Sequence, residues 1–136
     1  MKVVVNIDVP ELGRAIEFYC AALGLRHSRT LDNDVAELTG ASSVIYLLQK
    51  PSGSKAAETL LEPRCYARHW TPVHIDFVVD DIEQAAGRAL RAGAVRESEG
   101  TEWRASKCIT FSDPFGHGFC LIEFAGETYS DTAAPD

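Results

Sequence analysis

Two residues in the second half of the chain, His74 and Asp76, have the types and the spacing for polar chemistry on one surface. They stand two residues apart in a segment whose apolar positions alternate, so both side chains point to the same face of a strand. An imidazole holds a hydrogen bond or a metal ion, and a carboxylate accepts a hydrogen bond from a ligand or pairs with an arginine. The pair therefore predicts a polar binding face.

Aromatic residues beside arginines are the second group that could contact a ligand. The run from Arg64 to Trp70 mixes both types just before His74. We expect this run either to cover a binding site as a flap or to pack against a sheet edge or a second subunit, and the sequence leaves both open. Trp103 falls between two predicted strands, where its ring could stack on a planar or cationic ligand.

Four cysteines complete the set of reactive side chains, and none of them forms a C-x-x-C pair. They are Cys20, Cys65, Cys108 and Cys120. This spacing argues against a zinc knuckle and against a thioredoxin-type redox site. We expect each thiol to be reduced and buried as a small apolar side chain.

Composition and charge limit the partners of such a binding face. Of the 136 residues, 46% are hydrophobic and 24% are charged, which is ordinary for one soluble globular domain. The net charge is −7, and residues 72–136 contain twelve acidic against five basic side chains. This balance disfavours nucleic acid and suits a cationic ligand, although solubility alone also accounts for it. No apolar run is long enough to span a membrane, and the N-terminus is too polar for a secretory signal, which predicts a cytoplasmic protein without a membrane partner.

The elements that must position these residues occur twice, about seventy positions apart. In the first half we predict a strand over 3–9, a helix from Pro10 to Gly24 with the apolar stripe Leu12, Ile16, Tyr19 and Leu23, and strands over 25–31, 35–38 and 43–49. In the second half we predict a strand over 73–79, a helix from the capping box Asp80 and Glu83 to Gly93 with the stripe Ile82, Ala85, Ala86, Ala89 and Leu90, and strands over 95–101, 106–111 and 118–124.

This repeated βαβββ order predicts an α+β fold. Each module covers one face of its sheet with a helix and leaves the other face curved and open, so two modules enclose a cleft, within one chain or across a dimer. We expect a single domain over residues 1–136, with module one over 1–50, a linker over 51–71, module two over 72–125 and a tail over 126–136.

Three motifs resemble the vicinal oxygen chelate superfamily, which includes glyoxalase I, bleomycin- and fosfomycin-resistance proteins, extradiol dioxygenases and methylmalonyl-CoA epimerase. The segment Asp8–Tyr19 with Leu23-Gly24-Leu25 resembles the opening of these proteins, His74–Ile82 resembles the start of their second module, and Phe111–His117 resembles their closing Asp-Pro-x-Gly-His turn. The resemblance implies the glyoxalase/bleomycin resistance/dioxygenase fold over residues 1–125. It also implies that His117 has a structural role in the closing turn.

The resemblance also implies where a metal would be bound. Metal-dependent members hold a divalent ion with His, Gln or Glu side chains from the first and last strands of both modules. The corresponding positions are Val4, Tyr46, His74 and Cys120, and Asn6 could replace Val4 because it shares the same strand face. Only His74 is of the family's type, since a thiolate suits zinc rather than nickel, manganese or magnesium oxygen chemistry. We therefore favour a site without a metal, with a Zn, Ni, Mn or Fe ion on His74 as the alternative.

These residues lead us to expect a small-molecule-binding protein of the bleomycin-resistance type that forms a homodimer. The expected ligand is a cationic or aromatic organic molecule, and the expected ligand-binding residues are His74, Asp76, Asn6, Tyr46, Trp103, Cys120 and Trp70. A Cys120–His74 nucleophile pair lacks an orienting third group and an oxyanion hole, so no catalytic residue is predicted. The alternatives are a metal-dependent lyase, isomerase or dioxygenase with His74 as a ligand, and a structural module. Whether the chain is an enzyme stays open.

Overall fold

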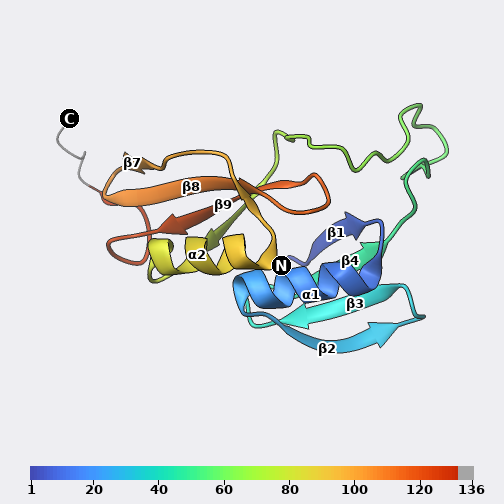
Figure 1. The fold of residues 1–136 in the computed structure, drawn as a ribbon, viewed down its shortest axis with the longest axis horizontal. Helices are drawn as coiled ribbons and strands as arrows, with labels where there is room; N and C mark the ends of the chain where they lie inside the picture. Colours follow the sequence, from blue (N-terminus) through green and yellow to red (C-terminus); the bar gives the residue numbers. More distant parts are fainter. Residues whose placement is uncertain (132–136) are drawn as a thin grey trace. The chain divides into compact units, whose positions relative to one another are not determined.

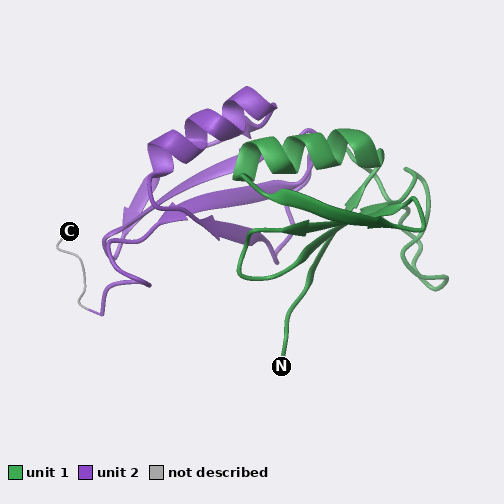
Figure 2. Cartoon of the chain, turned by 90° about the horizontal axis from the view of Figure 1, so that it is seen from below, with its two compact units in different colours: residues 1–67 green, residues 68–136 purple. Residues whose placement is uncertain are grey.

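A computed structural model describes residues 1–131, and the chain divides into two compact units (Figure 2). Unit 1 is Met1–Ala67 and unit 2 is Arg68–Asp136. Each unit has one helix and one mixed sheet, and the helix follows the first strand in both. The predicted α+β class is confirmed, and both units have the predicted order of a strand, a helix and further strands, although unit 2 has one strand more than predicted.

The elements follow the sequence pattern closely (Figure 1). Unit 1 contains β1 (Val5–Val9), α1 (Leu12–Leu23), β2 (Arg26–Leu31), β3 (Val35–Thr39) and β4 (Ile45–Gln49). Unit 2 contains β5 (Ile75–Val78), α2 (Ile82–Ala92), β6 (Val95–Arg96), β7 (Thr101–Trp103), β8 (Ser106–Ser112) and β9 (Gly118–Glu123). No helix in the described part of the chain is both long and apolar enough to cross a membrane.

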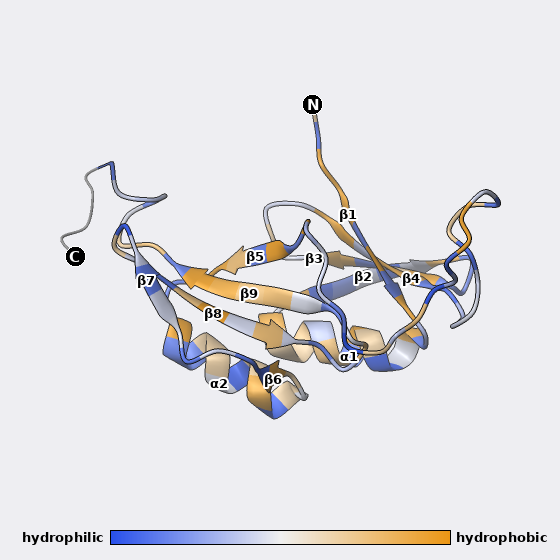
Figure 3. Cartoon of the chain, turned by 90° about the horizontal axis from the view of Figure 1, so that it is seen from above, coloured by the Kyte–Doolittle hydropathy of each residue, from blue (hydrophilic) through white to orange (hydrophobic). Residues whose placement is uncertain are grey.

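The sheet of unit 1 has the order β1-β4-β3-β2, with β1 and β4 parallel and the other neighbours antiparallel. The register pairs Ile7 with Leu47, and both side chains are buried on the face that α1 covers. Gln49 ends β4 on this face, and its Oε1 accepts a hydrogen bond of 2.8 Å from the backbone N–H of Leu12 at the start of α1. The opposite face is left for polar side chains. The edge strand β2 is exposed and hydrophilic (Figure 3).

Helix α1 ends where the sequence predicts, at Gly24, whose φ of 66° lies in the left-handed region that glycine tolerates. The predicted apolar stripe is wrong by part of a turn. Leu12 and Tyr19 are buried, but Ile16 and Leu23 are partly exposed, and the rest of the buried face consists of Ala15, Phe18 and Ala22. Because apolar residues surround most of this helix, contact with the sheet decides which of them are buried.

The sheet of unit 2 has the order β5-β9-β8-β6, and β7 pairs with another part of β8. The backbone N–H of Ile82, the first residue of α2, donates a 3.0 Å hydrogen bond to Oε1 of Glu123 on β9. Glu123 therefore lies on the face that α2 covers, together with Phe119 and Leu121 by alternation. Cys120 and Ile122 lie on the other face of β9, which we call the open face of unit 2.

Helix α2 begins one residue later than the predicted capping box. Its N-cap is Asp81, whose side chain accepts a hydrogen bond from the backbone N–H of Gln84, so the prediction of Asp80 as the cap is wrong. The helix ends before Gly93, as predicted, at a φ of 116°. Leu90 was expected in the buried stripe but is 44% exposed.

The single strand predicted over 95–101 is wrong, because the chain forms two short strands, β6 and β7. Between them, Arg96 Nε donates to the carbonyl of Ser98, and Ser98 Oγ accepts from the backbone N–H of Thr110. Gly100 follows with a φ of 110°. These contacts turn the backbone out of the extended conformation, so it cannot pair continuously with β8.

The remaining segments within residues 1–131 have no helix or strand. Residues 51–71, the predicted linker, are held by the ion pair of Arg64 with Asp8 at 2.7 Å and by the hydroxyl of Tyr66, which donates to the carbonyl of Lys50. All four cysteines are unpaired, but only Cys120 is buried. Cys20 and Cys108 are partly exposed and Cys65 is exposed, contrary to the expectation that each is buried. Part of the predicted tail, residues 132–136, lies outside the described residues.

Candidate functional site

Polar side chains form a row across the open face of unit 2. The register pairs Asp76 on β5 with Cys120 on β9, and Cys120 with Thr110 on β8. Directly opposite residues share a face, so these three side chains are neighbours. His74 precedes β5 on the same face, and its Nε2 lies 3.2 Å from Oδ1 of Asp76.

The ligand atoms of His74, Asp76 and Cys120 all lie within 4.8 Å of one another. The His74 and Asp76 side chains are each 35% exposed, whereas Cys120 is buried. Among the described residues this is the only group of three or more His, Cys, Asp or Glu side chains that could jointly hold a metal ion. Three of the seven predicted ligand-binding residues thus come together in one cluster.

The thiols of this face are protonated at neutral pH. Burial raises the pKa of Cys120, although the Thr110 hydroxyl, 3.5 Å from Sγ, acts in the opposite direction. Burial and the neighbouring Cys120 thiol raise the pKa of Cys108 to about 12. A neutral thiol is a poor nucleophile, since attack needs the thiolate.

Trp70 lies directly against this cluster. Its ring centroid is 4.8 Å from that of His74 at an interplanar angle of 37°, and 47% of the residue is exposed. Gly118 on β9 makes this position possible, because a Cβ atom there would lie 2.1 Å from Cε3 of Trp70. The guanidinium carbon of Arg68 is 5.8 Å from the Trp70 ring centroid. An indole face, an imidazole and a carboxylate are therefore adjacent on the open face of unit 2.

The predicted residues Asn6 and Tyr46 lie in unit 1, on the face of its sheet that α1 does not cover. The register places Asn6 opposite Tyr46, and Tyr46 opposite Glu37. The Tyr46 hydroxyl donates to Oε2 of Glu37 at 3.0 Å, and Arg29 donates to both oxygens of the same carboxylate. These bonds, with one from Ser28, lower the pKa of Glu37 to about 2. The hydroxyl hydrogen of Tyr46 is thereby used in the hydrogen bond to Glu37.

Trp103, the remaining predicted residue, lies at the end of β7 opposite Ser106. Ser106 is four residues from Thr110 along β8, which corresponds to about 13 Å of strand. Trp103 is 60% exposed and contacts Tyr129 and Arg104 instead of the cluster.

Thr110, Cys108 and Glu37 were not among the predicted site residues. The strand register could have identified them, because each of these residues shares a face with a predicted residue on the adjacent strand. The register depends on turns and bulges, which alternation in a single strand does not reveal.

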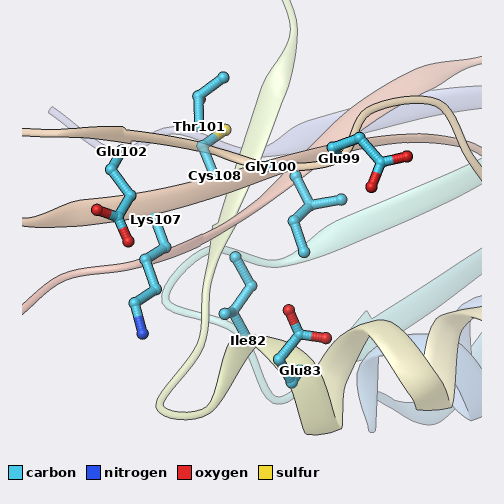
Figure 4. A pocket seen from close by; sticks show the side chains of 9 residues that line it. Ile82, Glu83, Glu99, Gly100, Thr101, Glu102, Lys107 and Cys108 are labelled. Atoms are coloured by element: carbon cyan, nitrogen blue, oxygen red, sulfur yellow. The ribbon is translucent and has the colours of Figure 1, made fainter.

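A separate hollow opens on the other side of the unit 2 sheet, between β7, β8 and the start of α2 (Figure 4). It has a volume of about 170 Å³ and is lined by Ile82, Glu83, Glu99, Gly100, Thr101, Glu102, Lys107, Cys108 and Ile109. Lys107 is paired with Glu123 at 3.7 Å, and Glu83 with Arg96 at 3.8 Å. None of the predicted site residues lines this hollow.

The donors do not fit an ion that binds two neighbouring oxygens of a substrate. Within unit 2 they are one imidazole, one carboxylate and one thiol. At the equivalent positions of unit 1, Val4 has no donor and the Tyr46 hydroxyl is bound to Glu37. Both oxygens of that Glu37 carboxylate already accept hydrogen bonds. Hard divalent ions prefer several free oxygen or imidazole ligands, so this set disfavours them.

Comparisons with known proteins agree with this fold. A family model described as a glyoxalase-like domain matches residues 4–122. A search of curated proteins finds no match. The chain is similar to the solved structure of the fosfomycin resistance protein FosX from Listeria monocytogenes, with 17% identity, a TM-score of 0.68, and coverage of 93% of this chain and 95% of that chain.

Two further solved structures are similar at comparable distance. A glyoxalase/bleomycin resistance protein/dioxygenase from Nocardioides has 16% identity and a TM-score of 0.66, with coverage of 98% of this chain and 89% of that chain. Lactoylglutathione lyase from Agrobacterium tumefaciens has 16% identity and a TM-score of 0.63, with coverage of 90% and 92%. At such identities the similarity establishes the fold, and the chemistry has to be argued from the site.

Proposed function

Because this chain belongs to the glyoxalase-like domain family, we propose that it binds a small aromatic cation on the open face of unit 2 without the help of a metal ion. The observation that carries the proposal is the contact of Trp70 with His74, which is itself paired with Asp76. An exposed indole attracts flat and cationic molecules through its ring face. A neighbouring carboxylate supplies a negative charge for the same ligand.

The buried part of the site supports binding rather than reaction. The Cys120 thiol has a raised pKa, and its neighbours are the Thr110 hydroxyl and the Cys108 thiol. These groups satisfy one another by hydrogen bonding and offer no activated nucleophile. The proposal does not use Asn6, Tyr46 or Trp103, whose roles stay predictions from the sequence, and association into a homodimer stays a prediction as well.

The first experiment measures ligand binding through Trp70. In a Trp103→Phe variant, the remaining tryptophan emission is titrated with the N-methylquinolinium cation and with quinoline, its analogue that is neutral at pH 7. We expect saturable quenching by the cation. Asp76→Asn should weaken binding of the cation about tenfold, which corresponds to about 1.4 kcal/mol, and should leave quinoline unaffected. Equal weakening for both probes, or no quenching by either, contradicts the proposal.

A metal-dependent lyase, isomerase or dioxygenase is the second candidate function. The cluster of His74, Asp76 and Cys120 favours it, since imidazole, carboxylate and thiolate are all ligands of zinc. Elemental analysis of the chain purified without an affinity tag separates the two candidates. Stoichiometric metal that disappears in both His74→Ala and Cys120→Ser supports the second candidate and overturns the metal-free proposal.

A further inference from the structure

Residues 68–70 form a short strap that is bound to the turn between β8 and β9. The backbone N–H of His69 donates to the carbonyl of Gly116 at 2.9 Å, and Nη1 of Arg68 lies 3.4 Å from the same oxygen. Arg68 also forms a two-point ion pair with Glu97, with Nε at 2.6 Å from Oε2. These backbone and side-chain contacts of Arg68 and His69 therefore fix the position of Trp70, the last residue of the strap.

The third attachment of the strap is a contact between two histidines. Nδ1 of His117 lies 3.0 Å from Nε2 of His69, and the rings meet edge to face with centroids 4.9 Å apart. At this distance one nitrogen must carry the hydrogen and the other must offer its lone pair. The contact therefore tolerates at most one positive charge. A second proton removes the acceptor and places two like charges side by side.

We propose that the His69–His117 contact is an acid-released latch that keeps Trp70 on the open face of unit 2. When both rings are protonated, residues 69 and 70 move away from the turn and the indole leaves His74, while Arg68 stays paired with Glu97. The released state binds more protons than the latched state, so acid favours release. Histidine is the side chain that usually changes its charge between pH 5 and pH 8, so the test covers this range and the mildly acidic range below it.

Charged groups lie beside the two rings on the strap and at the turn. Beneath the turn, the carboxylate of Asp113 accepts hydrogen bonds from the backbone N–H groups of Phe115 and His117. The pKa of Glu97 is lowered, chiefly by its hydrogen bonds from Arg68, so this carboxylate stays charged and keeps Arg68 anchored while residues 69 and 70 move.

Release of the latch would regulate the site proposed above, and this consequence rests on that proposed function. Trp70 packs on Gly118 and against His74, and it provides the aromatic surface of the site. When Trp70 moves off the sheet, a flat cation loses its stacking partner. Affinity for the N-methylquinolinium cation should therefore fall in parallel with strap release.

The test uses the full chain without any ligand, in buffer that contains EDTA. In the Trp103→Phe variant, the emission of Trp70 is recorded from pH 8 to pH 4.5, and far-UV circular dichroism monitors overall folding. We expect a reversible red shift at mildly acidic pH while the circular dichroism stays constant. His117→Gln should abolish this transition, and the matched control His27→Asn, which alters an exposed histidine of unit 1, should leave it unchanged.

His74 needs its own control, because its ring touches Trp70 and its protonation could alter the emission directly. The latch predicts that the transition survives in His74→Gln and disappears in His117→Gln. The opposite pattern, or a flat emission profile in the parent, overturns the proposal. A normal transition without any binding of the cation contradicts the proposed function but leaves the latch intact.

Discussion

The carboxylate of Glu37 receives hydrogen bonds from three side chains of unit 1. Oε1 accepts from Ser28 Oγ at 2.8 Å and from Arg29 Nε at 3.1 Å, and Oε2 accepts from the Tyr46 hydroxyl at 3.0 Å. The hydrogen bond from Arg29 contributes most to a pKa of about 2, below the usual value for glutamate. All of these donors favour the charged carboxylate. The hydrogen bonds of Ser28, Arg29 and Tyr46 to this carboxylate therefore depend on the ionisation of Glu37.

This lowered pKa predicts that unit 1 loses stability in acid. The unfolded chain takes up a proton on Glu37 near pH 4.3, whereas the folded chain does so near the lower value, so the contribution is full above about pH 5 and is lost as the pH falls to about 2. Urea unfolding at several pH values should show a free energy of unfolding that falls less steeply with acid in Glu37→Gln. Glu58→Gln, which changes an exposed linker carboxylate, should retain the full slope. Parallel slopes in all three proteins would contradict the assignment.

Gly118 is the residue that decides whether Trp70 can rest on the sheet. A Cβ atom at this position would meet Cε3 and Cζ3 of the indole at 2.1 and 2.3 Å. We predict that Gly118→Ala displaces Trp70, shifts its emission to the red in the Trp103→Phe background, and costs about 1–3 kcal/mol. In a Trp70→Ala background the same substitution should cost much less, because only the close approach to Nη2 of Arg68, at 3.0 Å, remains and the end of that side chain can shift. Additive costs in the two backgrounds would show that Gly118 matters for another reason.

At the scale of the elements, positions with a strict backbone requirement could be predicted and positions that depend on packing could not. Gly24 and Gly93 end both helices as the sequence indicates, because each adopts a positive φ. The neighbourhood of His74, Asp76 and Cys120 follows from strand order and alternation. The position of Trp70 does not, since the strap has no periodicity and its place is set by the missing side chain of Gly118.

The N-cap of α2 is Asp81, although the sequence predicts Asp80, and this difference can be tested directly. Asp81 accepts a hydrogen bond from the backbone N–H of Gln84, whereas Asp80 precedes the cap. Asp81→Ala should lower the free energy of unfolding by about 1 kcal/mol, the usual cost of losing an N-cap. The adjacent Asp80→Ala serves as the control and should change it by less than about half of that amount. A larger cost for Asp80→Ala would restore the capping box expected from the sequence.

The hairpin between β7 and β8 contains a turn whose residues are unusual for its backbone. Arg104 and Ala105 have φ values of 49° and 60°, although neither is glycine. A left-handed residue with a Cβ costs about 1–2 kcal/mol, and glycine loses part of that gain to its greater freedom in the unfolded chain. Ala105→Gly should therefore stabilise the chain by about 0.5–1 kcal/mol in urea unfolding. Ala85→Gly within α2 should destabilise it by a similar amount, so a loss of stability in both variants would contradict the turn assignment.

For the whole molecule, the two units keep one backbone arrangement and differ in the chemistry placed on it. Asn6 and Tyr46 are paired across parallel strands in unit 1, as Asp76 and Cys120 are in unit 2. On the next strand the partners are Glu37 and Thr110. In unit 1 the carboxylate of this row, Glu37, is bound by Arg29. In unit 2 His74 and Trp70 lie beside the row. The repeat therefore predicts where a site can be, and the side chains assign the ligand-binding chemistry to unit 2.

The overall charge of −7 adds a prediction at this scale, because the acidic excess lies in residues 72–136, which form most of unit 2. A negative field around the site raises the local concentration of a cation, and salt screens that field over about 10 Å at 0.1 M. Raising sodium chloride from about 0.05 to 0.5 M should therefore weaken binding of the N-methylquinolinium cation several-fold. Neutral quinoline makes the same stacking contact without the charge, so its Kd should stay constant. If both probes respond equally to salt, the acidic residues serve solubility alone and do not recruit the ligand.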